Sequence, residues 1–531
     1  ISSAASDVYK RQMIVTANLS RGAISMSKKK VIVKNIDSIQ NLGAMNILCT
    51  DKTGTLTQDR IILEMHLNYL GRDSAEVLQL AFLNSFYQTG LKSLLDVAVL
   101  NHLEIHAALE IENRFIKIDE IPFDFQRRLM SVVVEEENHH HELICKGAVE
   151  EILAICIQVK DGDLIKPLDQ AIREGVLQLT SNLNNDGLRV IAVAYKEVPR
   201  QHEPYSLADE SALTLVGLIA FLDPPKESAA QAIKELNRGG VAVKVLTGDN
   251  QVIARKTCKD VGLHVEGILL GSEIEALSEQ ELGARVEGAT IFAKLTPLQK
   301  SRIIKVLRGR GHVVGFMGDG INDAAALREA DIGISVDTAV DIAKESADIV
   351  LLEKSLLVLN EGVAEGRRTF GNIVKYIKMG TSSAFGNMFS MLGASIALPF
   401  LPMLPVQILL NNLLYDFSQT GIPFDQVDPD YLEKPRKWKV NEIRRFMVCI
   451  GPVSSLFDYA TFALMWFVFK ANSVENQSLF QTGWFVESLM TQTLIVHIIR
   501  TAKVPFLQSR PSLAMALVTV CVMGIGIMIP F

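Results

Sequence analysis

The chain has 531 residues, of which 53 are basic and 60 acidic, and its mean hydropathy is +0.22. This charge balance excludes nucleic acid as the partner, since nucleic-acid-binding proteins carry a clear basic excess. A hydrophobic share of 48% excludes a disordered chain, and six scattered cysteines without a CxxC pair argue against a disulfide framework. No charged residue occurs between Met379 and Tyr415. Composition therefore indicates a water-soluble part joined to a membrane part.

The soluble part comes first along the chain. Residues 1–12 are polar and contain no initiating methionine, so we expect them to be non-native and the chain to be a fragment of a longer protein. From there to about residue 358, short apolar runs alternate with amphipathic helical stretches. This alternation is typical of α/β domains with parallel strands.

Three of the apolar runs end in small, polar and acidic residues. They lead into Asp51–Thr57 (DKTGTLT), Thr247–Asn250 (TGDN) and Gly318–Asp323 (GDGIND). In a doubly wound sheet the ligand site lies at the carboxyl ends of the strands, so we expect these segments to converge. A lone aspartate after a strand is typical of a helix cap or turn, and TGDN alone is typical of a loop. The seven-residue DKTGTLT, followed by TGDN and GDGIND in this order, indicates a catalytic site.

The chemistry that these residue types favour is phosphoryl transfer, which needs a nucleophile, a metal ion and donors around the phosphate. Asp51 is the candidate nucleophile and would form an aspartyl-phosphate. Asp51 and Asp319 would share a Mg²⁺ ion, which prefers oxygen ligands. Lys300 would place a point charge on the phosphate. The other expected contributors are Thr247, Gly248 and Asp249 for catalysis, with Thr53 and Asp323 for the metal.

These motifs, together with Asp223–Pro225 (DPP), resemble those of the P-type cation-transporting ATPases, which belong to the haloacid-dehalogenase-like superfamily. The resemblance covers the chain from residue 13 to its end. It implies an α/β phosphorylation domain with a doubly wound parallel sheet, an inserted α+β nucleotide-binding domain, and an all-α transmembrane bundle. The implied boundaries are 13–35 for the tail of the actuator and stalk region, 36–57 and 216–358 for the phosphorylation domain, 58–215 for the nucleotide-binding domain, 359–377 for a stalk helix, and 378–531 for the membrane domain.

The resemblance also implies a site for ATP in the inserted domain. Ile121–Val134 (IPFDFQRRLMSVVV) and Lys146-Gly147-Ala148 match the nucleotide motifs of the family. By that match Phe123 would stack on adenine with Lys146 beside it, and the remaining residues expected to bind the cofactor are Asp96, Arg189, Thr53 and Asn322. Without the family, Phe123 would be interpreted as a core aromatic residue and Lys146 as a surface lysine.

Five apolar stretches follow, each near the ~20 residues that a bilayer requires. They are residues 378–398, 405–424, 447–469, 480–499 and 513–531. Basic loops at 434–445 and 500–510 place these loops and the soluble part in the cytoplasm by the positive-inside rule. We therefore expect a multi-pass protein of the plasma (inner) membrane, with the basic loops available to anionic lipids. Few helix breakers occur from about Ser355 to Leu398, which predicts one continuous helix entering the first span.

Asp416 is the only charged residue between Lys378 and Asp425. A carboxylate within a span costs ~2.5–3.5 kcal/mol and indicates function. Asn412 lies one turn earlier and Asn387 lies in the preceding span, so the three are expected to bind the transported ion. The alternative for the asparagines is hydrogen bonding between helices. Two further intramembrane carboxylates, Asp458 and Glu487, are interpreted as packing or gating residues.

Four stretches resemble the magnesium-transporting branch of the family: Phe221–Ser228 (FLDPPKES), Asn411–Gln419 (NNLLYDFSQ), Lys434–Trp438 (KPRKW) and Phe480–Val486 (FQTGWFV). The implied function is ATP-driven Mg²⁺ import through an aspartyl-phosphate. One alternative is a pump for another divalent cation such as Ca²⁺. The other is a membrane-anchored phosphatase. A phosphatase of this kind needs an acidic residue two positions after the nucleophile to protonate the leaving group, and Thr53, which occupies that position, cannot act as the acid. Because no TGES-type actuator loop is present, the fragment alone is not expected to complete a transport cycle.

Overall fold

The computed structural model describes residues 2–52, 54–58, 60–89, 92–102, 115–124, 127–136, 140–200 and 204–531. The chain forms two compact units. The first unit consists of residues 1–48, 234–242 and 307–531, and the second of residues 49–233 and 243–306.

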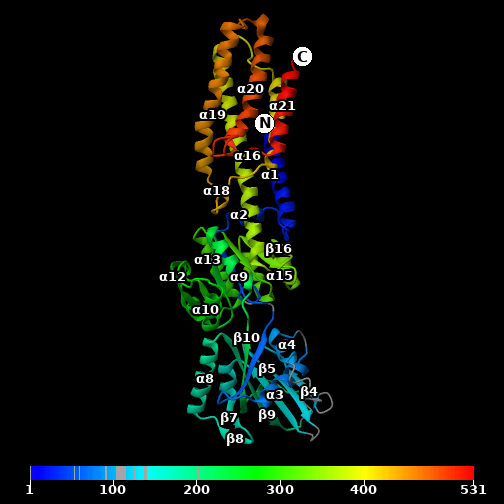
Figure 1. The fold of residues 1–531 in the computed structure, drawn as a ribbon, viewed down its shortest axis with the longest axis vertical. Coiled ribbons are helices and arrows are strands. Elements are labelled where there is room, and N and C mark those ends of the chain that lie inside the picture. Colours follow the sequence, from blue (N-terminus) through cyan, green and yellow to red (C-terminus); the bar gives the residue numbers. More distant parts are fainter. Residues whose placement is uncertain are drawn as a thin grey trace. The chain divides into compact units, whose positions relative to one another are not determined.

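The second unit contains a mostly antiparallel sheet, which has eight strands among the described residues (Figure 1). Its order is β4-β5-β6-β9-β10-β7-β8, and β3 pairs with β10. The strands are β3 (Ile62–Asn68), β4 (Phe115–Ile121), β5 (Leu129–Glu136), β6 (His141–Gly147), β7 (Cys156–Asp161), β8 (Leu164–Pro167), β9 (Leu188–Val198) and β10 (Leu213–Leu222).

Helices cover both faces of this sheet because its central strands are apolar on both sides. Successive strand residues point to opposite faces. Val132 and Val134 of β5 pack with helices α3 (Ala75–Tyr87) and α4 (Leu94–Leu100), whereas Val133 packs with α7 (Val149–Ile155) and α8 (Gln170–Asn185). The result is the α+β insertion that the resemblance implies.

Parallel strands occupy the remainder of the second unit. Strand β13 (Ile291–Ala293) pairs in parallel with β11 (Ala242–Leu246) on one side and with β12 (Ile268–Leu270) on the other. The accompanying helices are α10 (Gln251–Asp260), α11 (Gly271–Ala276), α12 (Glu279–Val286) and α13 (Pro297–Gly309), while α9 (Glu227–Arg238) and β2 (Ile47–Thr50) lie on the boundary between the units in the sequence.

The first unit also contains parallel strands, and they are buried. β14 (Val314–Met317), β15 (Ile332–Val336) and β16 (Ile349–Leu351) are parallel, and β1 (Val31–Val33) is antiparallel at the edge. Uninterrupted apolar runs such as that of β14 are typical of parallel strands with both faces covered. The short helices of this part are α2 (Ser38–Ala44), α14 (Ala324–Glu329) and α15 (Asp341–Ser346).

Helix α16 runs without interruption from Leu356 to Ala397, so the prediction of one continuous helix is confirmed. Its N-cap residue is Ser355, whose hydroxyl accepts a hydrogen bond from the backbone N–H of Leu357 at 3.2 Å. Its 42 residues span about 60 Å. Gly366 allows close contact with α2, because a Cβ atom there would lie 2.9 Å from the backbone nitrogen of Gly43.

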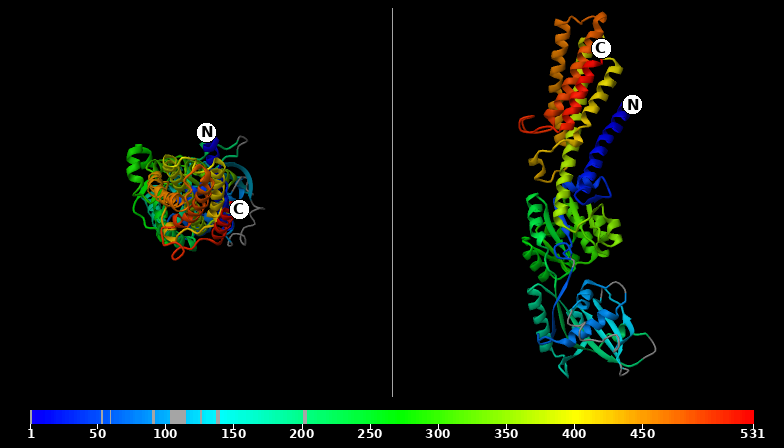
Figure 2. Two further views of the ribbon diagram at one scale, coloured as in Figure 1. Left: turned by 90° about the horizontal axis from the view of Figure 1, so that it is seen from above. Right: turned by 45° about the vertical axis from the view of Figure 1, so that its right-hand side comes forward.

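Four further helices lie beside the second half of α16 or beside one another (Figures 1 and 2). They are α17 (Pro405–Gln419), α19 (Val440–Ala463, continued by a π-helical turn at Leu464–Val468), α20 (Gln477–Ile499) and α21 (Leu513–Met528), and the N-terminal helix α1 (Ser2–Ser27) packs along α16. Each of the five expected apolar stretches overlaps one of these helices.

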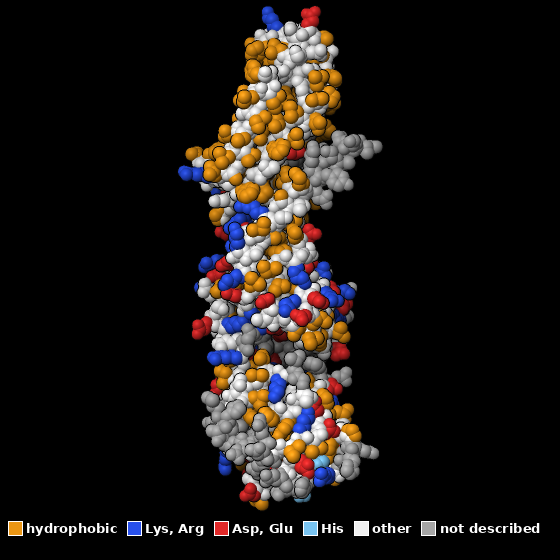
Figure 3. Space-filling model, turned by 90° about the vertical axis from the view of Figure 1, so that its right-hand side faces the viewer, with side chains coloured by type: hydrophobic (Ala, Val, Ile, Leu, Met, Phe, Trp, Pro, Cys, Tyr) orange, Lys and Arg blue, Asp and Glu red, His pale blue; other side chains and the backbone are white. Residues whose placement is uncertain are grey.

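The outward surface of these helices is largely apolar, as the face in Figure 3 shows. Exposed side chains include Leu409, Phe417, Phe457, Phe467 and Val520. Within the described residues, one helix, Val440–Val468, is long and apolar enough to cross a membrane by length and composition. The number of spans therefore stays a prediction.

Candidate active site

Asp51 follows β2 in the second unit and is paired with Lys300. The Nζ atom of Lys300 lies 3.0 Å from Oδ2 of Asp51, and the backbone N–H of Lys52 donates to Oδ1 at 2.7 Å. Lys300 is buried in the first turn of α13, which fixes its position. The structure thus brings together the predicted nucleophile and the predicted phosphate-binding lysine.

Lys52 lies between two further carboxylates and is 1% exposed. Its Nζ atom is 2.6 Å from Oδ2 of Asp223 and 2.7 Å from Oδ2 of Asp249. Burial alone would lower the pKa of Lys52, but Asp249 and Asp223 raise it above its ordinary value. Lys52 therefore remains charged and joins the DPP and TGDN segments immediately beside the nucleophile.

We expect Lys52→Met to destabilise the protein by about 3 kcal/mol, because it removes the buried cation that pairs with both Asp223 and Asp249. Thermal unfolding of the purified chain measures this effect. Lys256→Met is the matched control, since Lys256 pairs with Asp260 on the surface and such pairs contribute less than ~1 kcal/mol. Equal stability of Lys52→Met and the control would contradict the structural role of Lys52.

The TGDN turn is held in place by its own side chains. Thr247 Oγ1 accepts a hydrogen bond from the backbone N–H of Asp249 at 3.1 Å, and Asn250 caps α10. Burial would raise the pKa of Asp249, but Arg189, Lys52 and Lys300 lower it to about 2. Arg189, expected in the nucleotide pocket, lies 3.5 Å from Oδ1 of Asp249.

Two backbone segments pair where the chain passes between the parallel strands and the antiparallel sheet. The N–H of Gln58 donates to the carbonyl of Pro224 at 2.8 Å, and the N–H of Lys226 donates to the carbonyl of Leu56 at 2.9 Å. Lys226 Nζ also donates to the carbonyl of Gly54 at 2.7 Å. This pairing holds the DKTGTLT segment against the DPPK segment. DPP is recognisable in the sequence as a motif, but no local pattern predicts the contacts of Asp223, Lys226 or Lys52, whose partners lie more than 150 residues away.

The predicted nucleotide pocket contains a buried ion pair between Lys146 and Asp96. Ser85 Oγ lies 2.6 Å from Lys146 Nζ and 3.1 Å from Asp96 Oδ1. Burial lowers the pKa of Lys146, and Asp96 offsets this only in part. Phe123, two residues beyond β4, is 50% exposed, which leaves its ring accessible to a planar ligand.

The GDGIND segment belongs to the first unit. Asp319 forms an ion pair with Lys354, and buried Asp323 accepts a hydrogen bond from the N–H of Gly320 at 3.2 Å. Asn322 is exposed beside it.

Thr53, predicted to bind the metal, lies outside the described residues. The magnesium site shared by Asp51 and Asp319 stays a prediction, and within the described part of the chain no group of three or more His, Cys, Asp or Glu side chains is arranged to hold a metal ion.

The expected ion-binding residues of the bundle lie on two helices. On α17, Asn412 and Asp416 are both partly exposed. On α16, Asn387 Oδ1 accepts a hydrogen bond from Gln492 Nε2 of α20 at 2.9 Å, the kind of interhelical bond that is the alternative to ion binding. Asp458 accepts hydrogen bonds from Ser390 Oγ at 2.6 Å and Trp484 Nε1 at 2.8 Å, consistent with a packing role.

Two family models match the chain. Residues 70–228 match the model described as "P-type ATPase, cytoplasmic domain N", and residues 400–531 match "Cation transporting ATPase, C-terminus". These matches support the predicted fold class, a cytoplasmic domain with parallel and antiparallel sheets followed by a helical transmembrane region.

Similar proteins extend this agreement along almost the whole chain. Over 519 residues, 98% of this chain, it is 58% identical to "Magnesium-transporting ATPase, P-type 1" of Escherichia coli (strain K12). It is 54% identical over 522 residues to a protein of the same name from Salmonella typhimurium (strain LT2), and 32% identical over 452 residues, 80% of the chain, to a calcium-transporting ATPase of Listeria monocytogenes. The chain spans 58% of the length of the first two and 51% of the third. The chain belongs to the P-type cation-transporting ATPase family.

Proposed function

We propose that the complete protein containing this chain imports Mg²⁺ at the expense of ATP, through a phosphoenzyme formed on Asp51. The observation that carries the proposal is the contact between Asp51 and Lys300, next to the ion pairs of Lys52 with Asp223 and Asp249. A carboxylate oxygen of Asp51 would attack the γ-phosphorus of ATP, the bond from that phosphorus to the β–γ bridging oxygen would break and ADP would leave, while Lys300, 3.0 Å from Asp51, would neutralise charge on the phosphoryl group. The fixed TGDN turn would supply the Thr247 hydroxyl and the Gly248 N–H to the phosphate.

ATP would bind in the inserted domain. The exposed ring of Phe123 offers a stacking surface for adenine, and the buried Lys146–Asp96 pair gives the pocket a polar wall. A bound Mg²⁺ cofactor would neutralise developing charge on the phosphates. On this chain Asp51, Thr53, Asp319 and Asp323 are the residues proposed to hold it, because they supply the carboxylate and hydroxyl oxygens that Mg²⁺ prefers.

The membrane part would carry the ion. The apolar exterior of α17, α19, α20 and α21 suits contact with lipid, and five spans would place the basic loops and the soluble domains in the cytoplasm of a plasma (inner) membrane protein. Those basic loops would contact anionic headgroups. Asp416 and Asn412, with Asn387 released from Gln492, would supply oxygen ligands to a partly hydrated ion.

We favour Mg²⁺ over Ca²⁺ as the transported ion because of the sequence identities. The chain is 58% identical to the protein named as magnesium-transporting and 32% identical to the one named as calcium-transporting. The test is ATP hydrolysis by the complete protein, titrated with Mg²⁺ against Ca²⁺, Mn²⁺ and Ni²⁺, together with growth of a magnesium-starved strain. Stimulation by Mg²⁺ and rescue of growth are expected. Stimulation by Ca²⁺ alone would favour the calcium pump, and phosphate release without any cation stimulation would favour the membrane-anchored phosphatase.

A further inference from the structure

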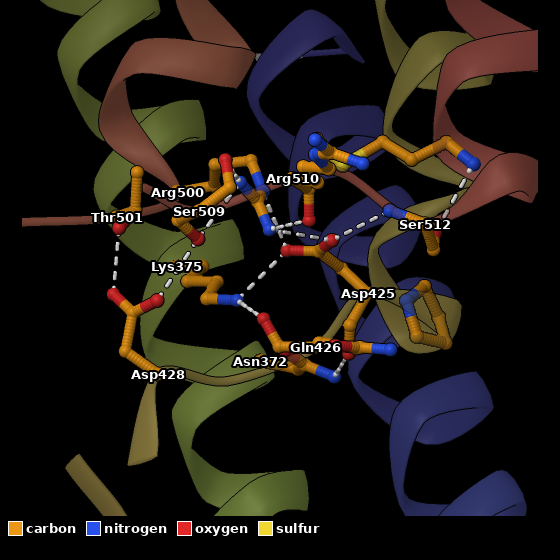
Figure 4. Close-up of polar contacts among 12 residues, drawn as sticks. Asn372, Lys375, Asp425, Gln426, Asp428, Arg500, Thr501, Ser509, Arg510 and Ser512 are labelled. Carbon is orange, nitrogen blue, oxygen red and sulfur yellow. Dashed lines mark hydrogen bonds and ion pairs between the residues drawn. The ribbon is translucent and has the colours of Figure 1, made fainter. Parts of the chain in front are cut away.

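A buried ionic junction lies beside the stalk part of α16, where the segment after α17 meets the end of α20 and the start of α21 (Figure 4). Asp425 follows α17, and its side chain is 0% exposed. Its Oδ2 atom lies 2.8 Å from Nζ of Lys375 and 2.9 Å from Nε of Arg500, and its Oδ1 atom lies 3.1 Å from Nη2 of Arg500. The backbone N–H of Ser512 also donates to Oδ1, at 3.2 Å. One carboxylate thus contacts α16, the end of α20 and the start of α21.

The two cations use their remaining donors within the junction. Lys375 donates to the carbonyl of Gln426 at 2.7 Å, and Arg500 donates to the carbonyls of Ser509 at 3.0 Å and Arg510 at 2.8 Å. Asn372, one turn before Lys375 on α16, donates to the backbone carbonyl of Asp425 at 3.1 Å. Both carboxylate oxygens of Asp425 therefore accept hydrogen bonds, and pairing of this kind is the condition under which buried charges favour one arrangement of a structure.

The position of the junction in the sequence relates it to the proposed ion site. Asp425 lies nine residues after Asp416, and Asn387 lies twelve residues after Lys375, about 18 Å along the continuous helix α16. Asp425 lies six residues beyond Gln419, the last residue of α17, so its pair with Lys375 joins α16 to the segment that follows α17. Tyr415 Oη donates to the carbonyl of Met379 at 3.3 Å and joins α16 to α17 itself, one residue before Asp416.

We propose that Lys375 and Asp425 are positioning residues that set the axial register of α16 against α17, and through it the spacing of Asn387 and Asp416. The inference rests on the proposed function, because the register matters only if these residues bind the ion. Ligands must be held within about 0.5 Å of their productive places, so a small slip of one helix weakens binding. Asp51 belongs to the second unit and the junction to the first, so we expect phosphorylation of Asp51 to change less than ion binding.

Lys375→Met tests the inference in the complete protein, because it removes the ion pair between α16 and Asp425 and leaves the Asp425–Arg500 pair intact. We expect the Mg²⁺ concentration for half-maximal ATP hydrolysis to rise about tenfold, equivalent to ~1.4 kcal/mol. We expect the phosphoenzyme formed from γ-labelled ATP and the maximal rate to stay within about twofold of the wild type. Arg368→Met is the matched control, because it removes an ion pair with Glu365 within α16 itself and should leave the Mg²⁺ dependence unchanged.

An unchanged Mg²⁺ dependence in Lys375→Met would overturn the inference, whether or not the thermal midpoint falls. If Lys375→Met does not fold, Asp425→Glu supplies the same measurement, since it keeps the charge but lengthens the side chain by one methylene. A rise in the half-maximal Mg²⁺ concentration in Asp425→Glu supports the inference, and wild-type behaviour overturns it. A wild type without Mg²⁺-stimulated hydrolysis would overturn the proposed function and this inference with it.

Discussion

Asp51→Asn is expected to abolish phosphorylation of the complete protein by γ-labelled ATP. The wild type should yield a phosphoprotein that survives acid and is cleaved by hydroxylamine, as an acyl phosphate is. Asparagine has almost the same shape but its amide is not a nucleophile, so labelling should fall by at least about 10³-fold. The loss would be mainly chemical, because the amide oxygen can still accept one of the two hydrogen bonds of Asp51, either that from the N–H of Lys52 to Oδ1 or that from Lys300 to Oδ2.

The matched control is Asp260→Asn, which removes a surface carboxylate paired with Lys256 in the same unit. Its labelling should equal that of the wild type. Acid-stable label remaining on Asp51→Asn would assign the phosphorylated residue elsewhere and remove the basis of the proposed phosphoenzyme. Label that forms on the wild type but turns over without any transported cation would instead indicate the phosphatase.

Asp416→Ala is expected to raise the Mg²⁺ concentration for half-maximal ATP hydrolysis at least about tenfold and to prevent rescue of a magnesium-starved strain. A carboxylate costs ~2.5–3.5 kcal/mol within a span, a cost that a bound cation would offset. Alanine removes the only formal charge of α17. Phosphorylation of Asp51 by ATP should persist, because Asp416 belongs to the transport site and not to the catalytic one.

Glu475→Ala is the control for Asp416, since Glu475 is an exposed carboxylate in the connection between α19 and α20. Growth rescue by this variant should match the wild type. Undiminished rescue by Asp416→Ala would exclude Asp416 from the transport site. Failure of both the wild type and the variant to rescue growth would argue against Mg²⁺ as the transported ion.

Local sequence patterns predicted the features that depend on neighbouring residues. The absence of strong helix breakers after Ser355 predicted α16, because helix continuity is decided over a few turns. Apolar runs ending in DKTGTLT, TGDN and GDGIND predicted strands followed by polar turns, and each run does form a strand. Alternation of apolar and polar residues likewise predicts a strand with one buried face, whereas a continuous apolar run predicts a strand buried on both faces.

Residues close together in the chain were enough to predict the family and the order of the α/β and helical parts, because motifs and hydrophobic patterns are local. Tertiary structure decided which distant side chains meet. Lys52 joins Asp223 and Asp249, Gln492 binds Asn387, and Asp425 pairs with Lys375 and Arg500. These partners are separated by 50 to almost 200 residues, and no local periodicity encodes such a pairing. They meet only because burial of the apolar faces places their helices and strands together, after which unpaired buried charges would cost several kcal/mol.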